Sequence, residues 1–390
     1  MNQPHLAARL QGLGTTVFAE MSALAARTGA VNLGQGFPDT DGPGEVIEAA
    51  VEALRTGHNQ YAPGIGIQSL REAIAAHQER FYGLTYDPAS EVLVTTGATE
   101  AIAAALLALV EPGDEVIALE PYYDSYVAGI SMAGGVRVPV TLQAPDFRLD
   151  VDALAAAVTK RTKLMLINSP HNPTGTVLNL DELTAVAALA VEHDLLVVTD
   201  EVYEHLTFDG LAHHPLAALD GMRDRTVAIS SGGKTFSFTG WKIGWVCASP
   251  DLVRAVNTTK QFMTFTSGAP LQPAIAQALA LPDSYFEAFR AELQSKRDRL
   301  CKGLAEVGFD VFVPQGTYFV TTDIRSLGYA DGMEFCLTLP ERAGVVAIPH
   351  QVLYDHTEVG KPLVRWAFCK REAVIDEALD RLAGGLVTRR

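Results

Sequence analysis

The sequence predicts an α/β protein with a mostly parallel central sheet that helices cover on both faces. Short apolar runs rich in β-branched residues recur through the middle of the chain, and alanine-rich segments with helical spacing separate several of them. Strands that are apolar on both faces and alternate with helices are typical of buried parallel sheets. We expect strands at residues 91–96, 114–120, 136–142, 163–168, 195–202 and 226–230, with helices at 100–109 and 182–192.

The segments before and after this region have a different pattern of apolar residues. Apolar spacing predicts helices at 17–27 and 43–55, an amphipathic helix within 59–83, helices at 271–281 and 283–307, and a small α/β unit from residue 309 that ends in a helix at 373–383. No internal repeat or flexible linker is visible. We therefore expect a large domain at 45–282 and a small C-terminal domain at 283–390, which the N-terminal segment 1–44 joins.

Composition and charge exclude several classes of protein. With 390 residues and 48% hydrophobic content, the chain can bury a large core. Its net charge of -16 argues against nucleic-acid or anionic-membrane partners, so a small anionic ligand would need local cations. The four cysteines lie far apart without a C-x-x-C pair, which indicates neither a metal site nor a disulfide framework. With no signal-peptide pattern and no membrane-length apolar run, we expect a cytoplasmic protein.

The candidate reactive residue is Lys234, in the run SSGGKTFSFTGWKIGW at residues 230–245. An apolar strand leads into small residues that turn tightly and present one lysine among aromatic and glycine residues. Burial lowers the pKa of a lysine, and a neutral amine can form a Schiff base with an aldehyde cofactor. Taken alone, the same lysine is also compatible with a surface position after a strand.

Three further motifs follow predicted strands. The turn 97–100 opens a helix whose free N–H groups suit an anion, although threonine capping alone explains it. The run 168–175, NSPHNPTG, places amide side chains at the carboxyl end of a strand, where α/β sheets bind ligands. Asp200 ends a very apolar strand, with Tyr203 three residues later. A buried carboxylate needs a cationic partner, such as a protonated pyridine nitrogen; otherwise Asp200 is an N-cap or surface residue.

Together these motifs resemble those of the class I aminotransferases, which belong to the pyridoxal-phosphate enzymes of fold type I. NLGQGFPD, NQYAPGIG, TTGATEAI, NSPHNPTG, TDEVYEH, SSGGKTFSFTGWKIGW and VRWAFCK occur in the family's order along nearly the whole chain. The resemblance is strongest to the branch of kynurenine, glutamine and methionine aminotransferases, and within it to the actinobacterial N-succinyldiaminopimelate type. It implies a seven-stranded sheet, pyridoxal 5′-phosphate as cofactor, and a homodimer with active sites at the subunit interface.

The resemblance also implies a role for each matching residue. Lys234 would bind the cofactor covalently and then move the proton between the substrate and the cofactor. Asp200 would keep the pyridine nitrogen protonated, and Asn172 and Tyr203 would bond the ring's 3′ oxygen. The remaining cofactor contacts would be the stacked ring of Tyr123 and a phosphate site of Ala98, Thr99, Ser231, Lys242 and, from the neighbouring subunit, Tyr61.

Substrate recognition follows from the same resemblance. Arg365 would grip the α-carboxylate, with Gly36 and Asn172 beside it. The implied reaction is transamination between an amino acid and a 2-oxo acid, with N-succinyl-LL-2,6-diaminopimelate and 2-oxoglutarate as the expected pair, in diaminopimelate and lysine biosynthesis. For the distal carboxylates of that donor, the sequence offers Arg9 or Lys260 as cations and the small side chains around residues 267, 268 and 353 as space.

Several alternatives stay open at this point. A methionine, glutamine or kynurenine aminotransferase would use the same residues, and so would a cysteine-S-conjugate β-lyase, which differs in losing a leaving group after proton abstraction. A regulatory protein with this body would need a DNA-binding region, which the acidic charge disfavours. A nicotinamide-dependent dehydrogenase is disfavoured because G-x-G-x-x-G does not follow any predicted strand.

Overall fold

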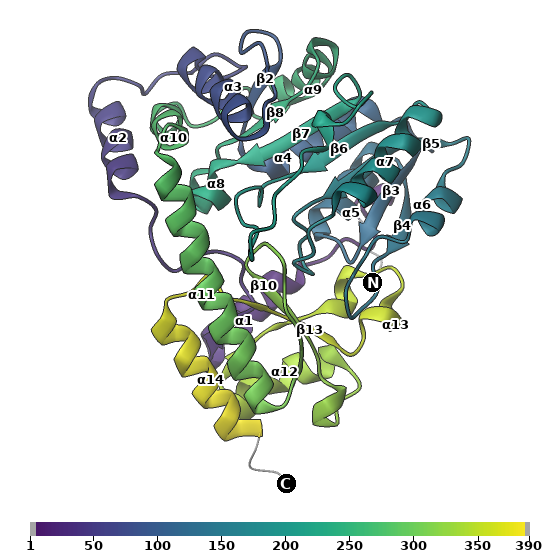
Figure 1. The fold of residues 1–390 in the computed structure, drawn as a ribbon, viewed down its shortest axis with the longest axis vertical. Helices are drawn as coiled ribbons and strands as arrows, with labels where there is room; N and C mark the ends of the chain where they lie inside the picture. The colour runs from purple at the N-terminus through teal and green to yellow at the C-terminus, as the bar shows by residue number, and fades with distance from the viewer. Residues whose placement is uncertain (1–4, 387–390) are drawn as a thin grey trace.

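The computed structural model describes residues 5–386, and Figure 1 shows how they are arranged. Within them a seven-stranded sheet has the order β2-β8-β7-β6-β5-β3-β4. Strand β8 runs antiparallel to β2 and β7, and the pairs from β7 to β4 are parallel, which confirms the predicted sheet. The strands are β2 (Val92–Thr95), β3 (Glu115–Glu120), β4 (Val136–Thr141), β5 (Thr162–Asn168), β6 (Leu196–Asp200), β7 (Thr226–Ser231) and β8 (Gly244–Cys247).

Helices cover both faces of this sheet because its central strands are apolar on both sides. On β3, Val116 and Ala118 belong to one buried cluster, and the alternate residues Ile117 and Leu119 belong to another. Successive strand side chains point to opposite faces, so each face carries its own core. The helices that connect or cover the strands are α4 (Gly97–Leu109), α5 (Asp124–Ala133), α6 (Val151–Ala157), α7 (Leu180–Glu192), α8 (Gly232–Thr235) and α9 (Pro250–Met263).

A second, smaller arrangement of strands and helices lies below the large sheet in Figure 1. Its four-stranded sheet has the order β12-β13-β10-β9, and a separate parallel pair joins β1 to β11, so the chain's beginning packs with its end. Tryptophan and aliphatic side chains of these two sheets form one buried core with the helices α11 (Asp283–Val307), α12 (Gly332–Ala343) and α14 (Glu372–Leu386). The strands are β1 (Val31–Asn32), β9 (Asp310–Phe312), β10 (Phe319–Asp323), β11 (Val345–Val346), β12 (Ile348–Pro349) and β13 (Leu363–Ala367).

The long helix α11 (Asp283–Val307) runs from the level of the large sheet down to the small one (Figure 1). The other helices are α1 (Val17–Thr28), α2 (Gly44–Arg55), α3 (Gln68–Tyr82), α10 (Leu271–Leu279), α11 (Asp283–Val307), α12 (Gly332–Ala343), α13 (Thr357–Gly360) and α14 (Glu372–Leu386). Short 3-10 turns occupy Ala8–Leu10, Leu216–Ala218, Thr239–Trp241, Arg325–Leu327 and His350–Leu353. In the part of the chain that the structure describes, we find no helix with the length and apolar character that a membrane crossing requires.

The topology brings several polar strand ends to one place. Asn168 ends β5 and is in register with Asp200, which ends β6, and Asp200 is in register with Ile229 of β7. Ser231 ends β7 two residues further on. Because these strands are parallel, their carboxyl ends meet at one edge of the sheet, where open α/β folds bind ligands.

Candidate active site

A cavity of about 360 Å³ lies at this edge, between the large sheet and the small one. Its walls come from the ends of β5, β6 and β7, the start of α4, the N-terminal segment around Gly36, and strands β10 and β13. The following residues expected at the cofactor and the α-carboxylate line this cavity: Gly36, Ala98, Thr99, Tyr123, Asn172, Asp200, Tyr203, Ser231, Lys234, Lys242 and Arg365. Residues 267, 268 and 353, expected to leave space for the donor's distal end, do not line it.

Lys234 lies on α8, directly after β7. Its Nζ donates to the Tyr318 hydroxyl at 2.8 Å and, less directly, to the Gly36 carbonyl at 3.4 Å, and Tyr318 in turn donates to that carbonyl at 2.6 Å. Burial lowers the Lys234 pKa to about 8. At pH 7 such an amine is about a tenth neutral, whereas a lysine with an ordinary pKa is neutral in well under about a thousandth of molecules. The site therefore holds a lysine that is prepared for nucleophilic and proton-transfer chemistry.

Asp200 forms the floor of the cavity. The Tyr126 hydroxyl donates to its Oδ2 at 2.6 Å and the Val202 N–H to its Oδ1 at 3.3 Å, and none of the ion pairs found in residues 5–386 includes it. Burial raises the Asp200 pKa. A buried carboxylate without a cation is costly, so this position favours a cationic ligand group.

The turn around Asn172 is braced from the end of the neighbouring strand. Asn168 donates its side-chain amide to the Asp200 carbonyl at 2.8 Å and accepts the Asn172 N–H at 2.8 Å. Tyr203, which is 2% exposed, lies beside Lys234, whose Nζ is 5.7 Å from the centre of the tyrosine ring. Burial raises the Tyr203 pKa, so the phenol is neutral and can donate a hydrogen bond.

The start of α4 forms an anion site with Lys242. The first N–H groups of a helix have no acceptor within it and carry the positive end of its dipole. A Cβ on Gly244 would lie 2.6 Å from the Gly97 backbone, so this glycine lets β8 approach the helix start. Lys242 has a left-handed φ of 55°, which costs a non-glycine residue about 1–2 kcal/mol. The strained lysine and the free N–H groups suit a phosphate.

Arg365 enters the cavity from β13 on the opposite side. It is 2% exposed, and its guanidinium donates to Asn172 Oδ1 at 3.0 Å and to the Gly34 carbonyl at 2.8 Å, while its Nε has no partner. Burial lowers the Arg365 pKa to about 10, so the group stays charged at neutral pH. A buried guanidinium with carbonyl partners and no carboxylate favours an anionic ligand with two oxygens.

The structure adds residues that the sequence did not single out. Tyr126 holds Asp200, and Tyr318 holds Lys234. Tyr126 lies one helical turn after Tyr123, so helical spacing in EPYYDSY is a signal that could have found it. Tyr318 comes from the turn directly before β10, 84 residues from Lys234, and no local pattern indicates it.

Three other expectations are placed away from the cavity. Tyr61 is 84% exposed and its ring packs edge-on against Phe265. Lys260 is fully buried, and its ammonium donates to the carbonyls of Gly64 and Phe265, so it braces a loop and is not available to a substrate. Arg9 is exposed on the first 3-10 turn and does not line the cavity.

With this geometry in view, comparison with known proteins identifies the class. The sequence pattern of class I and II aminotransferases matches residues 28–382, so the chain belongs to this family, whose enzymes depend on pyridoxal phosphate. It is an aminotransferase.

Among individual relatives, the chain is 54% identical to the probable N-succinyldiaminopimelate aminotransferase DapC of Mycobacterium tuberculosis, over 96% of this chain and 97% of that protein. It is 41% identical to the methionine aminotransferase of Escherichia coli K12, over 96% of this chain and 97% of the relative. The solved structure of N-succinyldiaminopimelate aminotransferase from Mycobacterium tuberculosis matches with a TM-score of 0.95 at 55% identity, covering 97% of this chain and 99% of that one.

The residues present fit the family's cofactor. The cofactor has three parts that need different partners. Its aldehyde reacts with a nucleophilic amine, its protonated ring nitrogen pairs with a buried carboxylate, and its phosphate binds free N–H groups and a cation. Lys234, Asp200 and the start of α4 with Lys242 supply these three in one cavity, and Asp200 has no other cationic partner in the described chain.

Replacing Arg365 with lysine tests the carboxylate site. Lysine keeps the charge but loses the planar fork, so we expect KM to rise about 10- to 100-fold for both the amino donor and the oxo acid, with a smaller change in kcat. Steady-state kinetics with each substrate varied in turn measure this. Arg371→Lys, at an exposed arginine, is the matched control and should leave both KM values unchanged. Unchanged KM values in Arg365→Lys would place the carboxylate site elsewhere.

Proposed function

We propose that this chain transfers the amino group of N-succinyl-LL-2,6-diaminopimelate to 2-oxoglutarate, with bound pyridoxal 5′-phosphate, in diaminopimelate and lysine biosynthesis. The observation that carries the proposal is the 54% identity, along almost the whole chain, to a protein named as the probable enzyme of this activity. The cavity supports it with a buried arginine that both substrates can use in turn, since each presents an α-carboxylate.

When bound, pyridoxal phosphate supplies an aldehyde that joins amines and a ring that withdraws electrons from the substrate Cα. Asp200 would hold it at the ring nitrogen, Asn172 and Tyr203 at the 3′ oxygen, and Tyr123 against the ring face. The residues that would bind the phosphate are Ala98, Thr99, Ser231 and Lys242.

The chain's own groups then define the chemistry. Arg365 binds the α-carboxylate and thereby fixes which bond of the substrate Cα faces Lys234. The Lys234 Nζ, neutral often enough because its pKa is about 8, would take the proton from the substrate Cα and pass it to the cofactor. In the second half of the reaction it would move a proton in the opposite direction, to Cα. Tyr318 keeps that nitrogen in place between proton transfers.

The choice of amino donor is the sharpest test of the proposal. With 2-oxoglutarate as acceptor, we expect kcat/KM for N-succinyl-LL-2,6-diaminopimelate to exceed that for methionine, glutamine and kynurenine by at least about tenfold, or about 1.4 kcal/mol of transition-state discrimination. Coupled detection of glutamate measures all four donors in one assay. A tenfold preference for any other donor would reassign the enzyme, with methionine favoured by the apolar walls of Phe18 and Tyr123. Pyruvate release from a cysteine S-conjugate at a comparable rate would instead indicate a β-lyase.

We also propose that the protein is a homodimer in which Tyr61 completes the partner's phosphate site. The support is a group of exposed apolar residues on the loop before α3, the last turn of α9 and the segment after it, with Tyr61 and Phe262 each 84% exposed and Phe265 48% exposed. Such clustering is typical of interfaces. Light scattering should give about twice the 41.8 kDa chain mass, and Tyr61→Phe should weaken cofactor binding without changing that mass. A monomer that binds the cofactor equally well would contradict this proposal.

In the same proposal, residues 45–282 act as the large cofactor-binding domain and 283–390 as the small one, which the N-terminal segment 1–44 joins. The parallel pairing of β1 with β11 supports this assignment, because it ties the chain's beginning to the small sheet region. Residues 1–4 and 387–390 lie outside the described part of the chain.

A further inference from the structure

A second cluster of polar side chains lies in the core, outside the active-site cavity. His77 comes from α3, and Glu204 and His205 come from the turn after β6. Their exposures are 2%, 3% and 7%, and one possible ligand atom from each lies within 4.8 Å of those of the other two. We propose that these three residues bind a divalent metal ion, with zinc as the expected ion.

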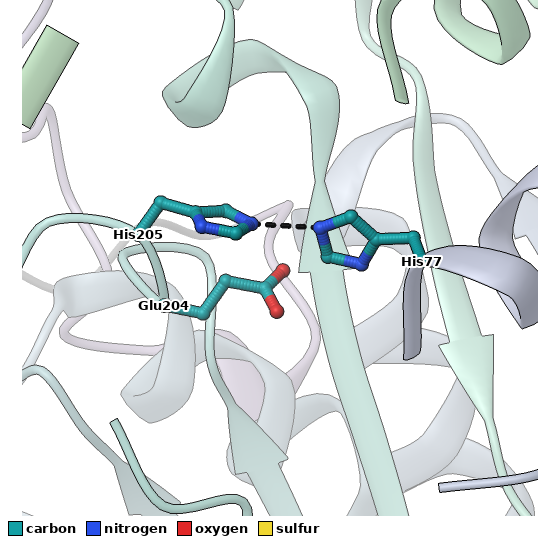
Figure 2. A group of neighbouring side chains, drawn as sticks. All are labelled: His77, Glu204 and His205. Carbon is teal, nitrogen blue, oxygen red and sulfur yellow. Dashed lines mark hydrogen bonds between the residues drawn. The ribbon is translucent and has the colours of Figure 1, made fainter. Parts of the chain in front are cut away.

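The first argument is the way the three side chains face one another. In Figure 2 the two imidazole rings meet edge to edge and the Glu204 carboxylate points toward the space beside them. The two Nε2 atoms are 2.7 Å apart. Glu204 Oε1 accepts a hydrogen bond from Ser230 at 2.5 Å, and Tyr82 also bonds the Glu204 carboxyl group, whereas His77 Nδ1 has no partner. The cluster therefore contains a deeply buried carboxylate oxygen aimed at two ring nitrogens.

The second argument is charge. Among residues 5–386, no lysine or arginine forms an ion pair with Glu204, and the neighbouring Glu201 has only His213 as a partner, at 2.9 Å. Burial raises the pKa of Glu204 to about 7, against the opposing hydrogen bonds of Ser230 and Tyr82, because no nearby cation of the described chain stabilises the charged form. A bound cation would stabilise the charged carboxylate, which water cannot do at this buried position.

The third argument is the chemistry of the ligand set. Two imidazoles and one carboxylate form a His₂Glu set, which is a known zinc set, with water in the fourth position. Burial lowers the His77 pKa to about 3 and the His205 pKa well below its usual value, so both rings are neutral and offer a lone pair. The rings of Phe81 and Phe286 lie 4.7 Å and 4.5 Å from His205, which gives the dry surroundings that strengthen metal binding.

Binding requires a small adjustment of the geometry. Zinc–nitrogen bonds of about 2.0–2.1 Å at a tetrahedral angle place two ligand nitrogens about 3.3 Å apart. The two rings must therefore separate by roughly 0.6 Å from their hydrogen-bonded contact. The bound ion would then replace the hydrogen bond between the two rings.

The position of the cluster gives the ion a structural role. His77 and His205 are 128 residues apart in sequence, which is why ligand spacing along the chain indicated no metal site. The ion would join α3 to the segment that carries Asp200 and Tyr203. It would thus stabilise the turn on which two cofactor contacts depend, without touching the cavity itself.

The test measures zinc binding to the holoenzyme. After dialysis against a chelator, the protein is saturated with zinc chloride, freed of excess ion, and analysed by plasma mass spectrometry, with calorimetry for affinity. We expect one zinc per chain and a higher Tm with the ion. His77→Gln and Glu204→Gln should each weaken binding by at least about 100-fold, whereas His193→Gln, at an exposed histidine, should bind normally.

Two results would overturn the proposal. One is the absence of a tight, stoichiometric ion in the unmodified holoenzyme, which needs no variant to fold. The other is unchanged zinc affinity in a folded His77→Gln variant, which would assign the ion to other ligands. In both cases His77, Glu204 and His205 form a neutral hydrogen-bonded network. Neither result bears on the choice of amino donor.

Discussion

Replacing Lys234 with alanine is expected to abolish transamination while leaving the protein folded. The change removes the amine that lies beside Tyr203 in the cavity. Under the proposed function, it thereby removes both the covalent attachment of the cofactor and the proton carrier. General acid–base catalysis alone contributes about 10²–10⁴ in rate, so the combined loss should exceed about 10⁴-fold. Glutamate formation in the coupled assay measures the loss, and the yellow colour of bound cofactor should change because the covalent link is gone.

Stability should change little in the same variant. Lys234 Nζ makes two hydrogen bonds, to Tyr318 and Gly36, and each contributes about 1 kcal/mol. Removing a buried charged group without an anionic partner offsets part of this loss. Tyr318→Phe is the matched control, since it removes the hydroxyl that holds the amine but keeps the amine itself. It should lower kcat far less than Lys234→Ala. Near-normal turnover by Lys234→Ala would contradict the assigned reaction and the site together.

Much of the large sheet could be predicted because its strands carry their signal locally. β3, β5 and β7 are buried on both faces, so they read as short apolar runs bounded by turns. β8 was missed because it is four residues long, begins with Gly244, and follows directly on the glycine-rich segment after Lys234. Its antiparallel pairing with β2 and β7 depends on residues far away in sequence, and no local pattern encodes it.

Helices were missed for a related reason. The segment of α5 begins in the aromatic run at Tyr123 and is small and apolar, so it has little polar face to define a helical period. α9 begins with Pro250, a favoured first helical residue that sequence reasoning passed over. Both helices pack on the same face of the large sheet, the face where Val116 and Ala118 of β3 are buried.

The residues of the candidate site also differ in whether local sequence indicates them. Residues within motifs, such as Lys234 and Asp200, could be named because their neighbours in sequence restrict the chemistry. Among their supporting partners, Tyr126 could have been found from its helical spacing to Tyr123, but its bond to Asp200, 74 residues away, could not. Tyr318 lies 84 residues from Lys234 and no local pattern indicates it. Supporting contacts between distant segments are properties of the fold, which a single sequence does not display.

Asp200 and Arg365 form an opposed pair of buried charges that only ligands can complete. Among residues 5–386, neither the Asp200 carboxylate nor the Arg365 guanidinium forms an ion pair, and both groups line the same cavity. In an acidic protein, a cavity with both deficits selects a ligand that is cationic at one end and anionic at the other. We therefore expect substitution of Asp200 to have the second largest effect on activity, after that of Lys234.

Replacing Asp200 with alanine is expected to lower kcat/KM by about 10²–10⁴-fold, since breaking a buried charge pair costs about 3–5 kcal/mol. Cofactor affinity, measured by fluorescence titration, should fall in parallel. Asp200→Asn separates charge from shape, because an amide oxygen still accepts the Tyr126 hydroxyl; it should lose nearly as much activity as alanine. Tyr126→Phe keeps the charge and removes only the 2.6 Å hydrogen bond, so its loss should be about tenfold. If Asp200→Asn retains normal turnover and cofactor content while Tyr126→Phe does not, the carboxylate serves only to hold Tyr126, and the charge argument is wrong.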